Sequence, residues 1–119
     1  MIYFIGAGPG AADLITVKGK ELLEKADLVI YAGSLVNPEL LKYCKPECTI
    51  MNSATMTLEE VIAAMVPAAQ AGQLVVRLHT GDPSVYGAHR EQIDLLRSYN
   101  LDYEVVPGVS SFCAAAACL

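Results

Sequence analysis

The chain has 119 residues, which is enough for one domain and too few for two complete ones. Eight Lys and Arg face thirteen Asp and Glu, so the net charge is −5, and the absence of a basic stripe argues against a nucleic-acid partner. There is also no apolar run of about 18 residues and no basic leader, so we expect no membrane partner, no secretion and a cytoplasmic location.

The first apolar run, residues 2–6, leads directly into the glycine turn Gly6-Ala7-Gly8-Pro9-Gly10. Four more short apolar runs follow, and the five together cover residues 2–6, 27–32, 47–51, 74–80 and 102–107. Because they alternate with helical patterns, they predict βαβ units. We therefore expect an α/β fold of three layers, with a five-stranded, largely parallel sheet and helices on both faces.

Four helices are predicted between these strands. Thr16 is placed to cap the first, with Val17, Leu22 and Leu23 on its apolar side. Residues 38–43 read as a short helix with proline in its first turn.

Thr57 and Glu60 form a capping box for the next helix, which we expect Pro67 to kink or interrupt and Gly72 to close. Residues 88–99 form the last predicted helix. Its inward residues are expected to be Ile93, Leu96 and Tyr99.

The four cysteines, Cys44, Cys48, Cys113 and Cys118, have neither C-x-x-C spacing nor histidine partners. We expect reduced, mostly buried thiols and no metal site. The mean hydropathy is high, at +0.40, and residues 114–119 form an apolar run without a helix cap. Both features lead us to expect that a second, C-terminal domain is missing from this chain.

Ligands of open parallel sheets bind beyond the carboxyl ends of the strands, where the loops of this chain are rich in small and polar residues. Gly6, Gly8 and Ala11 match the permissive dinucleotide pattern G-x-G-x-x-G/A. However, the helical pattern begins only near Thr16, and Asp27 lies at the wrong end of the second strand to hold a ribose. A nicotinamide dinucleotide is therefore the weaker of the cofactor hypotheses.

Three blocks in order resemble the tetrapyrrole methylase family: residues 6–10, the segment Gly81-Asp82-Pro83, and residues 106–111. The resemblance covers essentially the whole chain. Within the family, residues 31–36, 52–57 and 77–88 are most similar to the enzymes that methylate ring carbon 11 of precorrin-4 or cobalt-precorrin-4. The resemblance implies S-adenosyl-L-methionine as methyl donor, a tetrapyrrole substrate, a second α/β domain and a homodimer.

The resemblance also implies which residues bind the donor, with Pro9 facing the substrate-side opening. The donor-binding residues that we predict are Pro9, Thr80, Gly81, Asp82, Val85, Ser110 and Ser111. Uroporphyrinogen methyltransferases of the family usually carry an Asp where this chain has Ala32. No catalytic base is therefore inherited, and the catalytic residues stay unassigned.

Polar and aromatic residues in the same loops are candidates for substrate contacts, and turn, capping or anchoring roles explain them equally well. The predicted substrate-binding residues are Ser34, Ser53, His79 and Tyr86, with Asn52 and Arg77 as weaker candidates. Other readings of the chain remain open. They are another precorrin or uroporphyrinogen methyltransferase, diphthine synthase, a dinucleotide-dependent oxidoreductase domain and a stand-alone nucleotide-binding module.

Overall fold

The computed structural model of the chain describes residues 1–6, 15–31, 38–79 and 90–106. One sheet holds all its strands, which are β1 (Ile2–Gly6), β2 (Leu28–Tyr31), β3 (Thr49–Asn52), β4 (Val75–His79) and β5 (Tyr103–Val106). The strand order is β3-β2-β4-β1-β5, and every neighbouring pair is parallel. The predicted five-stranded parallel sheet is confirmed, with β3 shifted slightly toward the C-terminus.

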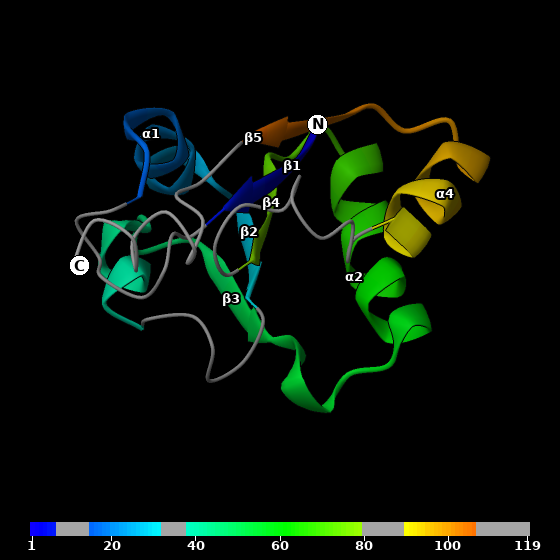
Figure 1. Cartoon of the computed structure of the whole chain (residues 1–119), viewed down its shortest axis with the longest axis horizontal. Coiled ribbons are helices and arrows are strands. Elements are labelled where there is room, and N and C mark those ends of the chain that lie inside the picture. The colour runs from blue at the N-terminus through cyan, green and yellow to red at the C-terminus, as the bar shows by residue number, and fades with distance from the viewer. Residues whose placement is uncertain (7–14, 32–37, 80–89, 107–119) are drawn as a thin grey trace, which may run out of the picture.

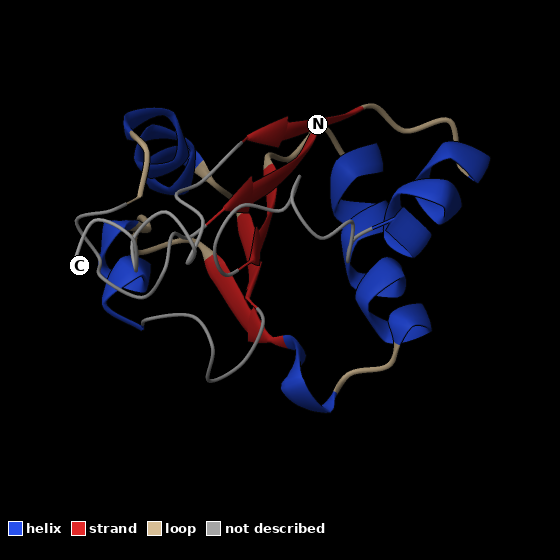
Figure 2. Ribbon diagram, in the orientation of Figure 1, coloured by secondary structure: helices blue, strands red, loops and turns tan. Residues whose placement is uncertain are grey.

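Helices cover both faces of this sheet (Figures 1 and 2). One face carries α1 (Val17–Lys25) and the 3₁₀ helix η3 (Pro38–Tyr43), and the other carries α2 (Leu58–Gln70) and α4 (Arg90–Ser98). A single 3₁₀ turn, η4 (Ser53–Thr55), follows β3. None of the helices in the described part of the chain is long and apolar enough to cross a membrane.

Successive strand residues point to opposite faces, so the sheet contributes to two separate cores. Ile2 and Phe4 of β1 pack toward α2 and α4, whereas Ile5 packs toward α1. The first core consists of Ile2, Phe4, Leu28, Ile30, Val61, Ile62, Met65, Val66, Val75, Ile93 and Leu96. The second consists of Ile5, Leu23, Ala26, Val29, Leu40, Val76, Leu78 and Val106.

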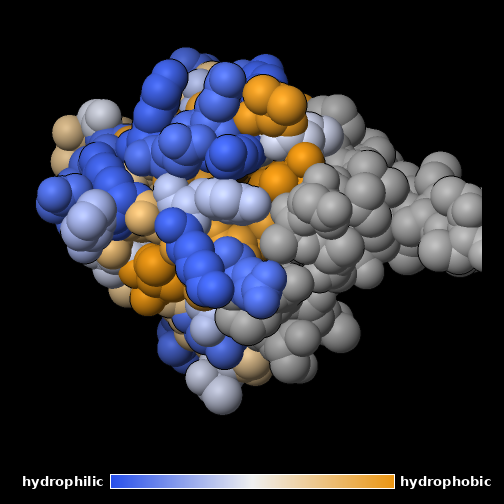
Figure 3. Space-filling model, turned by 90° about the vertical axis from the view of Figure 1, so that its left-hand side faces the viewer, coloured by the Kyte–Doolittle hydropathy of each residue, from blue (hydrophilic) through white to orange (hydrophobic). Residues whose placement is uncertain are grey.

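The start of α1 is set as predicted, because the Thr16 hydroxyl accepts a hydrogen bond from the backbone N–H of Gly19 at 3.1 Å. The predicted inward position of Val17 is wrong, since this side chain is 74% exposed. The buried residues of the segment are instead Gly19, Leu23 and Ala26, and their helical spacing turns Val17 outward. The side of the molecule that lies on the left in Figure 1 carries hydrophilic residues that alternate with smaller hydrophobic areas (Figure 3).

The predicted N-cap of α2 is also confirmed, and Glu60 reaches back to the Thr57 hydroxyl. The Thr57 hydroxyl accepts from the backbone N–H of Glu60 at 3.2 Å and donates to the Glu60 carboxylate at 3.4 Å. The predicted interruption at Pro67 is wrong, because the helix continues to Gln70. Pro67 and Ala63, four residues earlier, are both exposed, so the carbonyl that loses its helical partner lies on the solvent side.

Gly72 closes α2 as expected. Its φ of 81° lies in the left-handed region, and the backbone N–H groups of Gly72 and Gln73 donate to the carbonyls of Ala69 and Ala68. This is the paired hydrogen bonding of a Schellman motif, which glycine forms without a steric penalty.

Helix α4 ends in the same way, with Asn100 at φ 57° instead of a glycine. Leu101 donates to the Leu96 carbonyl, and Asn100 donates to that of Arg97. The expected burial of Ile93 and Leu96 is confirmed, whereas that of Tyr99 is wrong because its side chain is 50% exposed. The helix ends at Ser98, so Tyr99 no longer follows the helical spacing.

Candidate functional site

The carboxyl ends of the five strands form one edge of the sheet. Gly6 of β1 is the register partner of His79 of β4, Ile5 pairs with Val106 of β5, and Tyr31 of β2 pairs with Asn52 of β3. The segments that follow the strands, where the sequence places the ligand-binding loops, therefore all leave from this edge.

The neighbours β1 and β4 meet the topological condition for a ligand crevice. The connection after β1 leads to α1 on one face of the sheet, and the connection after β4 leads to α4 on the other face. Connections that diverge from adjacent parallel strands open a crevice between them. The edge at Gly6 and His79 is thus the candidate site, with β5 beside it.

Two of the predicted site residues, Ser53 and His79, lie among the described residues. The structure places His79 by its backbone, as the last residue of β4. The predictions that fall outside the described residues are Pro9, Ser34, Thr80, Gly81, Asp82, Val85, Tyr86, Ser110 and Ser111. For these residues, the structure fixes the strand ends from which their segments depart.

Ser53 lies at the candidate edge, just beyond β3. Its hydroxyl donates to the carbonyl oxygen of Tyr31 at 3.0 Å, so it joins the ends of β3 and β2. The neighbouring Asn52 has a local role, since its side-chain oxygen accepts from the backbone N–H of Ala54 at 2.9 Å and caps η4. The turn and capping roles considered for these two residues are therefore present in the structure, and a substrate contact by Ser53 stays a prediction.

Arg77 is not available to a substrate carboxylate, because it is only 6% exposed. Its Nε donates to the side-chain oxygen of Gln92 and its Nη1 donates to the carbonyl of Ile30, each at 3.2 Å. The expectation of a substrate contact by Arg77 is thus wrong. A single charge inside the apolar strand Val75–His79 is the sequence signal that marks this buried polar cluster.

Asp27 lies at the opposite, amino end of β2, as the sequence implied. One carboxylate oxygen accepts from Lys45 Nζ at 2.7 Å, and the other accepts from the backbone N–H of Leu74 at 2.9 Å. These two hydrogen bonds, first the one from Lys45, lower the pKa of Asp27. Asp27 therefore links the segment after η3 to the starts of β2 and β4, and it does not face the candidate site.

Metal and redox chemistry find little support in the described residues. No group of three His, Cys, Asp or Glu side chains there is arranged to hold a metal ion. Cys44 and Cys48 are free and half-buried, rather than mostly buried as expected, and burial raises the pKa of Cys44 to about 11. A thiol with that pKa is almost fully protonated at neutral pH, so it is a poor nucleophile.

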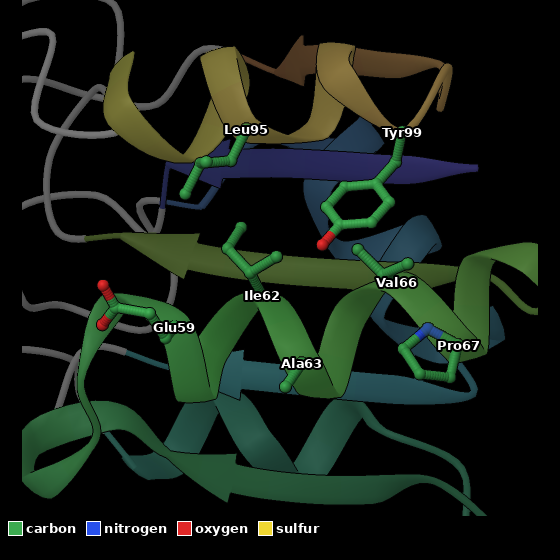
Figure 4. Close-up of a pocket in the computed structure, with 7 residues that line it drawn as sticks. All are labelled: Glu59, Ile62, Ala63, Val66, Pro67, Leu95 and Tyr99. Atoms are coloured by element: carbon green, nitrogen blue, oxygen red, sulfur yellow. The ribbon is translucent and has the colours of Figure 1, made fainter.

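A second concave surface lies between the outer sides of α2 and α4 (Figure 4). The side chains of Ile62, Val66, Leu95 and Tyr99 point into it, and its rim includes Glu59. This groove is mostly apolar and lies on the helical layer. It is not formed by strand ends, so it does not coincide with the predicted ligand-binding edge.

The sheet order, the crossovers and the neutral strand ends define an open α/β domain whose candidate ligand site is the carboxyl edge of the sheet. The family model of the tetrapyrrole (corrin/porphyrin) methylases matches residues 1–119. The chain therefore belongs to the tetrapyrrole methylase family.

Individual proteins of this family are also similar to the chain. The chain is 58% identical over 118 residues to the cobalt-precorrin-4 C(11)-methyltransferase of Methanocaldococcus jannaschii, and the match covers 99% of this chain and 46% of that protein. The crystal structure of a cobalt precorrin-4 methyltransferase superposes with a TM-score of 0.94 at 51% identity, covering 98% of this chain and 49% of that one. The chain thus spans about half the length of the curated relatives it matches.

A further solved structure bears on the ligand. The uroporphyrin-III C-methyltransferase of Thermus thermophilus, in complex with S-adenosylhomocysteine, superposes with a TM-score of 0.79 at 35% identity. That match covers 97% of this chain and 47% of the solved chain.

Proposed function

We propose that the chain is the N-terminal half of an S-adenosyl-L-methionine-dependent methyltransferase that acts on ring carbon 11 of cobalt-precorrin-4 or precorrin-4 in cobalamin biosynthesis. The observation that carries the proposal is the 58% identity to a cobalt-precorrin-4 C(11)-methyltransferase over 99% of the chain. The fold supports the proposal as well, because the chain superposes on a cobalt precorrin-4 methyltransferase with a TM-score of 0.94.

The described residues are compatible with the methyl donor. Gly6, His79 and Val106 end three adjacent strands, and the donor-binding positions of the proposal follow them as Pro9, Thr80 to Val85, and Ser110 with Ser111. Gly6 has no side chain, so no Cβ at the end of β1 obstructs the close approach of a ligand. In this proposal, the segments that follow β1, β4 and β5 all contact the methyl donor.

When bound, the donor would supply the methyl group of its sulfonium to an electron-rich ring carbon by in-line displacement, in which the new carbon–carbon bond forms as the methyl–sulfur bond breaks and the sulfur leaves as a neutral thioether. Such a reaction depends mainly on orientation and exclusion of water, which can supply much of the rate enhancement. The strand ends Gly6, Tyr31, Asn52, His79 and Val106 include no carboxylate and no Lys or Arg. The proposal gives these strand ends a role in binding and orienting the reactants and leaves the catalytic residues unassigned.

The proposal assigns substrate contacts to residues at and beyond the ends of β2, β3 and β4. Ser34, Ser53, His79 and Tyr86 are its substrate-binding residues, and Ser53 holds its place through the hydrogen bond to Tyr31. The full-length protein is expected to be a cytoplasmic homodimer whose second α/β domain forms the other wall of the cleft. Sedimentation of the purified full-length protein tests the dimer, and cell fractionation tests the location.

Titration calorimetry on the full-length protein tests the cofactor. We expect S-adenosylhomocysteine to bind and NAD not to bind. Binding of NAD alone would reverse the assignment in favour of a dinucleotide-dependent oxidoreductase. Transfer of a labelled methyl group to cobalt-precorrin-4, precorrin-4 and uroporphyrinogen III then identifies the substrate, with transfer to either of the first two supporting the proposal and transfer only to the third contradicting it.

A further inference from the structure

Arg77 is a cation among apolar residues in the middle of the sheet. Its neighbours Val75, Val76 and Leu78 are completely buried, and Arg77 itself is only 6% exposed. The guanidinium lies between two neutral acceptors, the Ile30 carbonyl and the side-chain oxygen of Gln92, at 3.2 Å from each. Gln92 is also buried, with 9% of its surface exposed.

Stability alone is a poor reason for this arrangement. The salt bridges within the described part of the chain are Lys18–Glu104 and Lys45–Asp27, and neither includes Arg77. Burial lowers the pKa of Arg77 to about 10, so the side chain still carries its charge at neutral pH. An apolar residue of similar volume commonly stabilises such a position better than a buried charge does.

The contact joins elements next to the candidate site. Ile30 is the penultimate residue of β2, Arg77 lies two residues before the end of β4, and Gln92 is in the first turn of α4. Residues 80–89 connect the end of β4 to the start of α4. Through its two hydrogen bonds, Arg77 therefore holds the start of α4 against the sheet, close to the carboxyl edge of the sheet.

The hydrophobic contacts of α4 begin at Ile93, directly after Gln92, and continue at Leu96. Apolar packing of this kind holds the helix on the sheet without a directional requirement, whereas the Arg77–Gln92 hydrogen bond is directional and acts on the first turn. Ligand sites depend on such supporting contacts, because small displacements reduce affinity.

We propose that Arg77 is a positioning residue for the methyl-donor site, which acts through Gln92 by fixing the start of α4 relative to the end of β4. The inference depends on the proposed function, which places donor-binding residues in the connection between these two elements. Arg77 itself touches neither donor nor substrate in this scheme.

The test uses the full-length protein and two independent disruptions of the contact, Arg77→Met and Gln92→Leu. Each should raise the Kd for S-adenosylhomocysteine roughly ten-fold, the scale of a lost hydrogen bond to a charged group. Gln92→Glu keeps an acceptor and should bind like the wild type. Steady-state kinetics should show a higher KM for S-adenosyl-L-methionine with an unchanged KM for the tetrapyrrole.

A destabilised variant separates positioning from general loss of stability. Met65→Ala removes a completely buried side chain from α2 that takes part in neither of the two hydrogen bonds of Arg77. At a temperature where all variants are folded by circular dichroism, we expect Met65→Ala to lower the thermal midpoint and leave the Kd unchanged.

Unchanged Kd values for Arg77→Met and Gln92→Leu, or an equal loss of affinity in Met65→Ala, would overturn the positioning role. If Arg77→Met does not fold, Gln92→Leu alone decides the question. Failure of the wild-type protein to bind S-adenosylhomocysteine would instead overturn the proposed function, and the inference with it.

Discussion

The Ser53 hydroxyl donates to the Tyr31 carbonyl at 3.0 Å, and this contact ties the end of the edge strand β3 to the end of β2. Tyr31 is the last residue of β2, so the hydrogen bond fixes the point where the chain leaves the sheet toward residues 32–37. With strands about 4.8 Å apart, Ser53 lies about 14 Å from β1, three strands away. Under the proposed function, Ser53 lies on the substrate side of the donor-binding strands β4, β1 and β5.

Replacing Ser53 by alanine tests this tie. We expect the free energy of unfolding of the full-length protein, measured in urea, to fall by about 1 kcal/mol, the usual net value of one hydrogen bond. Affinity for S-adenosylhomocysteine should not change, whereas the KM for the tetrapyrrole should rise. Ser53→Thr retains the hydroxyl and serves as the control. Equal stability of Ser53→Ala and wild type would mean that the hydrogen bond contributes nothing in solution.

The carboxylate of Asp27 makes stability depend on pH. Its pKa in the folded state is lowered, mainly by the hydrogen bond from Lys45 and then by that from Leu74. A lowered folded-state pKa contributes stability above the unfolded value of about 3.9, and this contribution is lost as pH falls through the folded-state pKa. Wild type should therefore lose its advantage over Asp27→Asn as the pH falls below about 4.

Urea denaturation of both proteins at pH 7 and at pH 3 measures this difference. Lys45→Met is the matched partner variant, because it removes the first cause of the pKa shift and leaves the Leu74 hydrogen bond in place. A wild-type advantage that stays constant between the two pH values would contradict the assigned role of Asp27.

Much of the fold was predictable because local chemistry and tertiary structure agree. Thr16 and Thr57 cap their helices, Gly72 ends α2, and the apolar runs become parallel strands. Two predicted inward positions fail for different reasons. Tyr99 lies beyond the end of α4, whereas Val17 lies inside α1 but off the buried face formed by Gly19, Leu23 and Ala26.

The site was less accessible to sequence reasoning. The family resemblance indicates which loops carry ligand-binding residues, but the contacts that support them depend on register. Ser53 meets Tyr31 because β2 and β3 pair in a particular alignment, and Arg77 meets Gln92 through the packing of a helix on a strand. Such contacts follow no sequence period, so residue spacing alone does not reveal them.

Two adjacent leucines of α4 offer a matched comparison of burial. Leu96 is completely buried against the sheet, whereas Leu95 is 37% exposed on the groove side. We expect Leu96→Ala to lower the free energy of unfolding by about 2–5 kcal/mol, through lost burial and the cavity left behind. Leu95→Ala should cost clearly less. Similar urea midpoints for the two variants would contradict the packing of α4 described above.

Gly19 brings α1 close to β1 at the candidate site. A Cβ added there would lie 3.0 Å from Ile5 Cγ2 and 3.2 Å from Ile15 Cγ1. Ile5 is completely buried and immediately precedes Gly6 at the end of β1. The side chains of Ile5, Ile15 and the capping residue Thr16 therefore have to move by a few tenths of an ångström to admit an alanine.

Two opposing effects determine the result of Gly19→Ala. Alanine favours a helix interior over glycine by about 1 kcal/mol, but overpacking a buried contact costs about 1–3 kcal/mol. Because Ile5 is completely buried, we expect a net loss of stability in urea denaturation and weaker binding of S-adenosylhomocysteine. Glu21→Ala, on the exposed face of α1, is the control. A stabilised Gly19→Ala protein with unchanged affinity would show that α1 does not constrain the end of β1.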